Sequence, residues 1–160
     1  MRVDACQAGL LTLLVMGMVA ARAASSAEPT SVPFTTVASG RRSAVEAPLR
    51  TVIRDAAGWT ALWRKHTGSV SASPPAIDFR RSMVIVVFAG RVPVSTDLAV
   101  VRILSEGDRL VVQYRQAERR PPMDDGQETT PFHMVRLPRS GGAVRFQLAK
   151  TIPVLPGPGS

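Results

Sequence analysis

The sequence is poor in the side chains that bind metals and act as nucleophiles. Its 160 residues include one cysteine and two histidines. A structural zinc site of four cysteines, or of paired cysteines and histidines, is therefore excluded, and so is a disulfide network within the chain. No glycine-rich fingerprint follows an expected strand, and no Gly-Lys-Ser/Thr run indicates a phosphate loop. We therefore predict no metal and no cofactor.

Acidic and aromatic residues are also scarce. Asp and Glu number 12 against 20 Lys and Arg, which gives a formal net charge of +8, and aromatic residues make up 5% of the chain. Nucleic-acid binding requires a basic face with stacking aromatic rings, whereas the aromatic residues here lie in apolar patterns typical of a core. No nucleic-acid partner is predicted. Some of the basic residues fall in four separated pairs: Arg41-Arg42, Arg64-Lys65, Arg80-Arg81 and Arg119-Arg120.

The first 23 residues have the pattern of a secretory signal peptide. Arg2 precedes an apolar run over residues 10–21, and small residues occupy both recognition positions for cleavage after Ala23. The run is shorter than the roughly 20 residues of a membrane-spanning helix, so we expect no membrane span in the mature chain. Cys6 lies in the leader, which leaves the mature chain without a thiol. These features predict a secreted or periplasmic protein.

Composition divides the remaining chain into three parts. Residues 24–47 are rich in Ala, Ser, Thr and Pro, with Phe34 as their only large apolar group, and they are predicted to form a flexible linker. Residues 149–160 form a tail rich in proline and glycine, in which regular structure is disfavoured. The 101 residues from 48 to 148 are then the folding unit, a common size for one small domain.

An amphipathic helix is predicted over residues 56–67. Asp55 is suited to cap its start and Gly68 to end it. Four residues at helical spacing share one face, and we expect this face to cover a sheet. They are Trp59, Leu62, Trp63 and His66.

The rest of the folding unit is predicted to be strand and loop. Residues 83–89 are uninterruptedly apolar, as expected of a central strand buried on both faces. The other strands are predicted over residues 49–54, 98–104 with 110–115 as a hairpin, and 132–137 with 143–148 as a last hairpin, with a long loop over 116–131. The predicted fold is α+β: a mostly antiparallel sheet of about six strands with one amphipathic helix packed on it.

Serine hydrolysis is an enzymatic chemistry for which the sequence offers a candidate base and acid. Its base would be His66 or His133, oriented by Asp78, Asp124 or Asp125. The sequence contains no Gly-x-Ser-x-Gly turn that would expose a serine nucleophile. We therefore predict no catalytic residue and no enzymatic activity.

A hard cation is the metal that the sequence comes closest to binding. Asp124, Asp125, Glu128 and His133 are close in sequence, but the segment lacks the alternating oxygen donors of a calcium loop. A solvated acidic turn explains these residues more simply.

Three segments resemble the C-terminal domain of the PrcB family, the accessory subunits of exported protease complexes. They are Trp59–Trp63, Ile77–Phe79 followed by Met83–Gly90, and Thr130–Val135, and the likeness extends from Leu49 to Phe146. The resemblance implies an α+β, non-catalytic domain that binds or stabilises an exported protease.

Two functional hypotheses follow from the sequence. In the first, the protein is an exported, non-catalytic binding module that docks a partner protein through a sheet edge or through the 116–131 loop, because edge strands offer unpaired amides and carbonyls. In the second, it is a basic envelope protein whose arginine pairs bind polyanionic polymers.

Overall fold

The computed structural model describes residues 28–92, 96–118 and 128–149. The predicted signal peptide, the acidic residues Asp124 and Asp125, and the tail beyond Ala149 lie outside these ranges. Among the described residues, no helix has the length and apolarity needed to cross a membrane.

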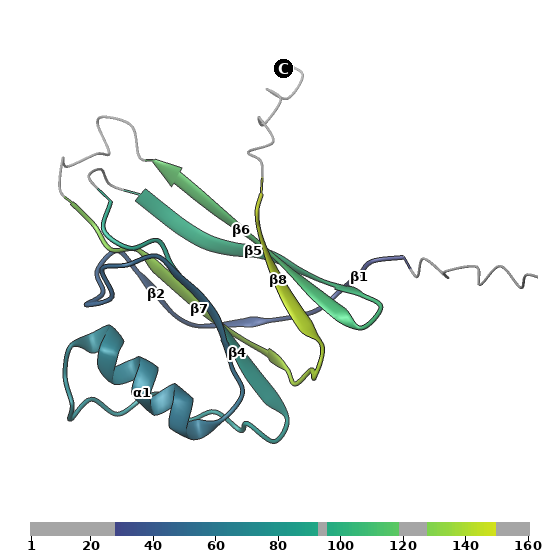
Figure 1. Ribbon diagram of the computed structural model, residues 1–160, viewed down its shortest axis with the longest axis horizontal. Coiled ribbons are helices and arrows are strands. Elements are labelled where there is room, and N and C mark those ends of the chain that lie inside the picture. The colour runs from purple at the N-terminus through teal and green to yellow at the C-terminus, as the bar shows by residue number, and fades with distance from the viewer. Residues whose placement is uncertain (1–27, 93–95, 119–127, 150–160) are drawn as a thin grey trace, which may run out of the picture.

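In these ranges, eight strands and one helix form two four-stranded sheets and a helical layer (Figure 1). We call the sheet with the order β1-β5-β6-β8 the outer sheet, and the sheet with the order β2-β7-β4-β3 the middle sheet. The outer sheet consists of β1 (Thr30–Ser31), β5 (Thr96–Glu106), β6 (Arg109–Glu118) and β8 (Ala143–Leu148). The middle sheet consists of β2 (Thr35–Gly40), β7 (Phe132–Pro138), β4 (Ser82–Phe88) and β3 (Leu49–Ile53).

The middle sheet is buried on both faces, with the helix α1 (Ala56–Thr67) on one side and the outer sheet on the other. Strand β4 shows this directly, because successive side chains of a strand point to opposite faces. Met83, Ile85 and Val87 belong to the cluster between the sheets. Val84, Val86 and Phe88 belong to the cluster beneath α1. The prediction of a central strand buried on both faces is therefore confirmed.

Helix α1 begins and ends where the sequence predicts. The side chain of Asp55 accepts a hydrogen bond from the Gly58 amide at 2.8 Å, and Gly68 closes the helix in the left-handed conformation at a φ of 67°. Trp59 is buried against the middle sheet, and its Nε1 donates to the Pro75 carbonyl at 2.9 Å. Packing of an apolar ring and pairing of its polar edge together hold the helix in place.

The broad α+β prediction is confirmed, but the number of strands and sheets differs. The expected single sheet of about six strands is two sheets with eight strands. The hairpin of β5 and β6 is present and longer than predicted, with Gly107 at a φ of 64° in its turn.

The predicted flexible linker is wrong for residues 28–47. Strand β2 pairs antiparallel with β7, and β1 pairs antiparallel with β5. Val45 is only 2% exposed and packs beneath α1. An edge strand of small polar residues has no hydrophobic alternation, so its composition matches that of a linker. Such a segment is recognised as a strand only through its pairing with a partner strand.

The predicted last hairpin is also wrong. Strands β7 and β8 lie in different sheets, and β8 instead pairs in parallel with β6. The short connection after β7 therefore passes from the middle sheet to the outer one. Val144 and Phe146 pack into the cluster between the sheets, so β8 satisfies its apolar alternation without pairing with β7.

The helix cap gives a test of this fold. Replacing Asp55 with Ala removes the acceptor for the Gly58 amide and is expected to lower the free energy of unfolding by about 1 kcal/mol. Urea unfolding measures the change. Asp55→Asn retains an acceptor oxygen and should stay close to the wild type; an equal loss in both variants would contradict the capping role.

Candidate functional site

Each of the two histidines, the candidate bases, is held in place by hydrogen bonds to neighbouring segments. The ring of His66 contacts Phe132, with the ring centroids 4.2 Å apart, and its Nδ1 is 2.9 Å from the Ser43 hydroxyl oxygen. That oxygen also accepts from the Val45 amide at 3.0 Å. The pair holds the segment before β3 against the end of α1. Burial lowers the pKa of His66, so the ring is neutral at pH 7.

His133 joins three strands. The Val100 amide of β5 donates to its Nδ1 at 2.7 Å, so the proton of the neutral ring lies on Nε2, which is 2.9 Å from the hydroxyl oxygen of Thr36 in β2. Burial lowers the pKa of His133 as well. With both nitrogens engaged, His133 connects the outer sheet to the middle sheet and has no free atom with which to act as a base.

No catalytic triad forms within the described ranges. His133 lies opposite Val87 near one end of β4, whereas Asp78 bonds to Ser82 at the other end of that strand, about 17 Å along it at 3.3 Å per residue. Asp124 and Asp125 lie outside the described residues. Sequence reasoning missed the contact between Ser43 and His66, because 23 residues separate them and no motif links them.

The predicted lack of a metal site stays a prediction. Of the acidic residues Asp124, Asp125 and Glu128, only Glu128 lies within the described residues. Among the described residues, no three His, Cys, Asp or Glu side chains are grouped as metal ligands. The Glu128 carboxylate is paired with Arg91 at 2.7 Å, and Arg91 also pairs with Glu46. The hydrogen bond that Arg91 donates to the Glu128 carboxylate, and the negative charge of that carboxylate, raise the pKa of Arg91.

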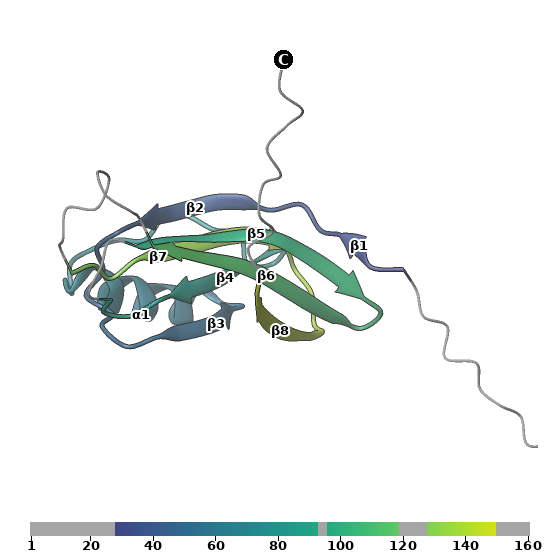
Figure 2. The ribbon, with the colours of Figure 1, turned by 90° about the horizontal axis from the view of Figure 1, so that it is seen from above.

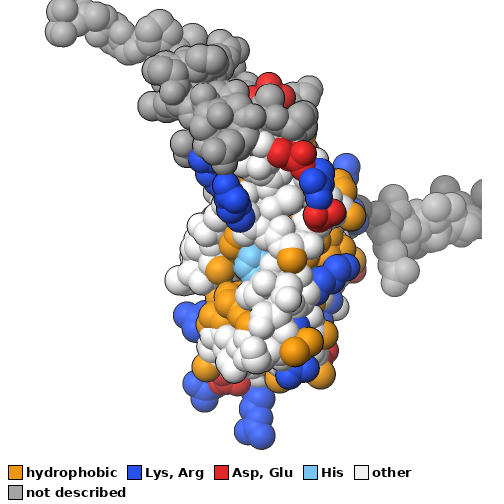
Figure 3. Space-filling view, turned by 90° about the vertical axis from the view of Figure 1, so that its left-hand side faces the viewer, with side chains coloured by type: hydrophobic (Ala, Val, Ile, Leu, Met, Phe, Trp, Pro, Cys, Tyr) orange, Lys and Arg blue, Asp and Glu red, His pale blue; other side chains and the backbone are white. Residues whose placement is uncertain are grey.

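The Arg119-Arg120 pair lies outside the described residues, and the other three basic pairs fall near the two ends of α1. Arg41-Arg42 and Arg64-Lys65 lie near the end of α1, where Ala44 donates to the His66 carbonyl. Arg80-Arg81 lies near the start of α1, where Arg139 bonds the carbonyls of Phe79 and Arg54. On the face shown in Figure 3, basic side chains lie at separate points around a largely uncharged centre. This division weakens the polyanion hypothesis.

A groove lies between the edge strands of the two sheets. Strand β3 ends the middle sheet and β8 ends the outer sheet, and Figure 2 shows both on the same side of the molecule, away from β2. The groove between them has a volume of about 780 Å³. It is lined by Arg50, Thr51, Val52, Arg54, Gly141, Gly142, Ala143, Val144 and Phe146.

The backbone of β8 presents half of its polar groups to this groove. The Ala149 amide donates to the Tyr114 carbonyl of β6, and alternate residues of a strand point their backbone groups the same way. Arg145 and Gln147 therefore pair with β6. The amides and carbonyls of Val144, Phe146 and Leu148 point outward, toward the free edge.

The same argument orients β3. The Ala89 amide donates to the Pro131 carbonyl on the β7 side of β4, so the amides of Phe88, Val86 and Val84 point to β3. Their partners Leu49, Thr51 and Ile53 are then the hydrogen-bonded residues of β3. Arg50 and Val52, which alternate with them, direct their amides and carbonyls into the groove.

The two edges run antiparallel to each other. Just after β3, the guanidinium of Arg54 donates to the carbonyls of Ser140 and Gly142, which precede β8. Near the start of β3, Arg50 lies over the Tyr114 ring at 5.0 Å, and Tyr114 is opposite Leu148 at the end of β8. The start of one strand therefore lies near the end of the other.

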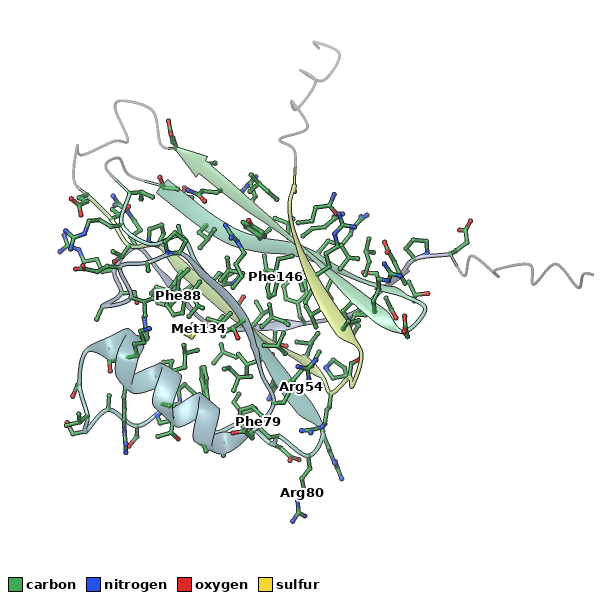
Figure 4. The ribbon with its side chains drawn as sticks, viewed as in Figure 1. Arg54, Phe79, Arg80, Phe88, Met134 and Phe146 are labelled. Carbon is green, nitrogen blue, oxygen red and sulfur yellow. The ribbon has the colours of Figure 1, made fainter. Side chains whose placement is uncertain are left out.

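One end of the groove is closed by two arginines. Arg54 reaches the carbonyls of Ser140 and Gly142, and Arg139 returns a hydrogen bond from its Nη1 to the Arg54 carbonyl at 2.8 Å. Figure 4 looks onto the groove, with Arg54 at this end. Sequence reasoning did not single out Arg50 or Arg54; their alternation with Val52 is the one signal that points to them.

Comparison of the chain with protein-family models, with curated proteins and with solved structures gave no match. The resemblance to the PrcB family therefore remains an interpretation of the sequence.

The buried histidines predict a pH dependence of stability. Because burial lowers their pKa values in the folded state, the unfolded chain binds protons first on acidification. The free energy of unfolding should therefore be greatest above the ordinary histidine pKa of 6.5 and should decrease as the pH falls through and below that value. Urea unfolding across this range measures the slope. His66→Gln and His133→Gln should each make it smaller; a stability that rises on acidification would contradict the prediction.

The orientation of β8 predicts an alternating pattern of amide hydrogen exchange. The amides of Arg145 and Gln147 should exchange slowly because they donate to β6, whereas those of Val144, Phe146 and Leu148 should exchange faster by at least about tenfold. Exchange followed residue by residue by NMR measures this. Uniform protection along β8 would show that its outer edge is already paired.

Proposed function

We propose that this protein is an exported, non-catalytic binding module that accepts an extended segment of a partner protein between β3 and β8. The added segment would complete the hydrogen bonds of both edges at once. Such strand addition obtains affinity from main-chain hydrogen bonds and selectivity from alternate side chains.

The observation that carries the proposal is the pair of free edges facing one groove. Stacked sheets lie about 10 Å apart, which is close to two spacings of about 4.8 Å between neighbouring strands. One added strand therefore matches the gap between the edges of two stacked sheets. Strands β3 and β8 run antiparallel, so the added strand would be antiparallel to one edge and parallel to the other, and both patterns are allowed.

The floor of the groove supports the same reading. Val52, Val144 and Phe146 are partly buried and pack against the cluster between the sheets. Inward side chains of an added strand would cover them and remove apolar surface from water, at about 25 cal/mol per Å². The resemblance to the PrcB family makes an exported protease the kind of partner that we would test first.

A proline at the free edge tests the proposal. Leu148 is 54% exposed and its amide points outward, so Leu148→Pro removes a donor from the free edge of β8 without removing a bond to β6. Leu148→Ala removes the same apolar side chain and keeps the amide. The probes are decapeptides selected from a random displayed library on the wild-type protein. Their affinity for Leu148→Pro should fall at least about tenfold relative to Leu148→Ala.

Circular dichroism and thermal unfolding establish that both variants stay folded. Equal affinity of the selected peptides for the two variants would contradict strand addition at β8. A library that yields no binding peptide would contradict the function itself.

A further inference from the structure

We infer that the groove selects an extended segment with the pattern acidic–x–apolar–x–acidic. The inference rests on the proposed strand addition and specifies the chemistry of the segment that is added. It follows from the side chains that β3 presents beside the groove.

Arg50, Val52 and Arg54 share one face of the chain. Side chains two residues apart in extended backbone point the same way, so these three follow one another at intervals of about 6.6 Å. Val52 packs into the cluster between the sheets, which places this face toward the outer sheet. The groove therefore has a cation, an apolar centre and a second cation in line.

Neither cation is neutralised by a carboxylate in the described part of the chain. Asp78 pairs with Arg81, and Glu46 and Glu128 pair with Arg91. Arg50 contacts the face of the Tyr114 ring, and Arg54 donates to two carbonyls, so both have uncharged partners. Each keeps its full positive charge at the groove.

An added strand would lie directly beside β3, where residues opposite each other form cross-strand pairs. Carboxylates opposite Arg50 and Arg54 would be four residues apart in the partner, with an apolar residue opposite Val52 between them. That central residue would also meet Phe146 from the other edge, because Phe146 packs into the same cluster. The pattern reads the same in both directions, so it fits either orientation of the added strand.

Charge-assisted pairing gives this pattern its selectivity. A carboxylate opposite a guanidinium that lacks an acidic partner gains a hydrogen bond to a charged donor, which is stronger than one between neutral groups. A basic segment would instead place like charges opposite each other, which is unfavourable. The protein's net charge of +8 acts in the same direction over a longer range.

Two synthetic peptides test the inference by fluorescence anisotropy at low salt. One is acetyl-Ser-Glu-Thr-Val-Thr-Glu-Ser-amide, and the other has Gln in place of both Glu. The Glu peptide should bind the wild type at least about tenfold more tightly, and added salt should reduce this preference. Arg50→Gln should remove most of the preference.

Arg80→Gln is the matched control for charge. Arg80 is exposed, and Figure 4 shows it pointing away from the groove. Its replacement lowers the net charge by the same amount and should leave both affinities unchanged. An equal loss in Arg80→Gln and Arg50→Gln would show attraction by net charge alone and would overturn the inference.

Leu148→Pro separates the inference from the proposed function. If the Glu peptide no longer binds to Leu148→Pro, and Arg50→Gln has lost most of the preference for the Glu peptide, both the inference and the proposed function are supported. If the two peptides bind equally to the wild type and neither binds to Leu148→Pro, the acidic pattern is overturned and strand addition is supported. A Glu preference unaffected by Leu148→Pro contradicts strand addition and, with it, the alignment on which the inference depends. Absence of binding by both peptides overturns the inference.

Discussion

Backbone amides and carbonyls in a sheet need partners, and this requirement organises the whole structure. The middle sheet cannot slide, because β4 is buried on both faces and a shift of one residue would exchange the side chains beneath α1 with those facing the outer sheet. With β4 held in register, β3 is held as an edge. The core therefore determines which backbone groups reach the groove.

The two sides of the sandwich meet this requirement differently. On one side, the chain itself passes from β1 in the outer sheet to β2 in the middle sheet, and His133 accepts the Val100 amide. A neutral ring is suited to that buried position, because a charged group there would lose hydration. On the other side, Arg54 and Arg139 bridge one end. Along the rest of the groove, the outer edges of β3 and β8 have no neighbouring strand in the described part of the chain.

Local features of the fold were predictable from the sequence, and pairings between distant segments were not. The span of α1, the Asp55 cap and the buried β4 depend on neighbouring residues or on one apolar run. Strand β2 has a linker-like composition and becomes a strand through β7, which follows it by about 90 residues. Strand β8 pairs with β6 and not with its neighbour β7, a choice between sheets that strand periodicity does not encode. The groove depends on both of these non-local pairings, so it could not be derived from the sequence.

The arginines of β3 illustrate why an apparently ordinary residue can carry function. In the sequence, Arg50 and Arg54 flank Val52 in a short strand and are two of many basic residues. In the structure they are the cations beside an edge whose backbone points into a groove. An exposed cation alone discriminates little between partners, because water screens it. Beside a strand edge, the register of an added segment would set which of its side chains faces each guanidinium, and the charge would then select sequence as well as sign.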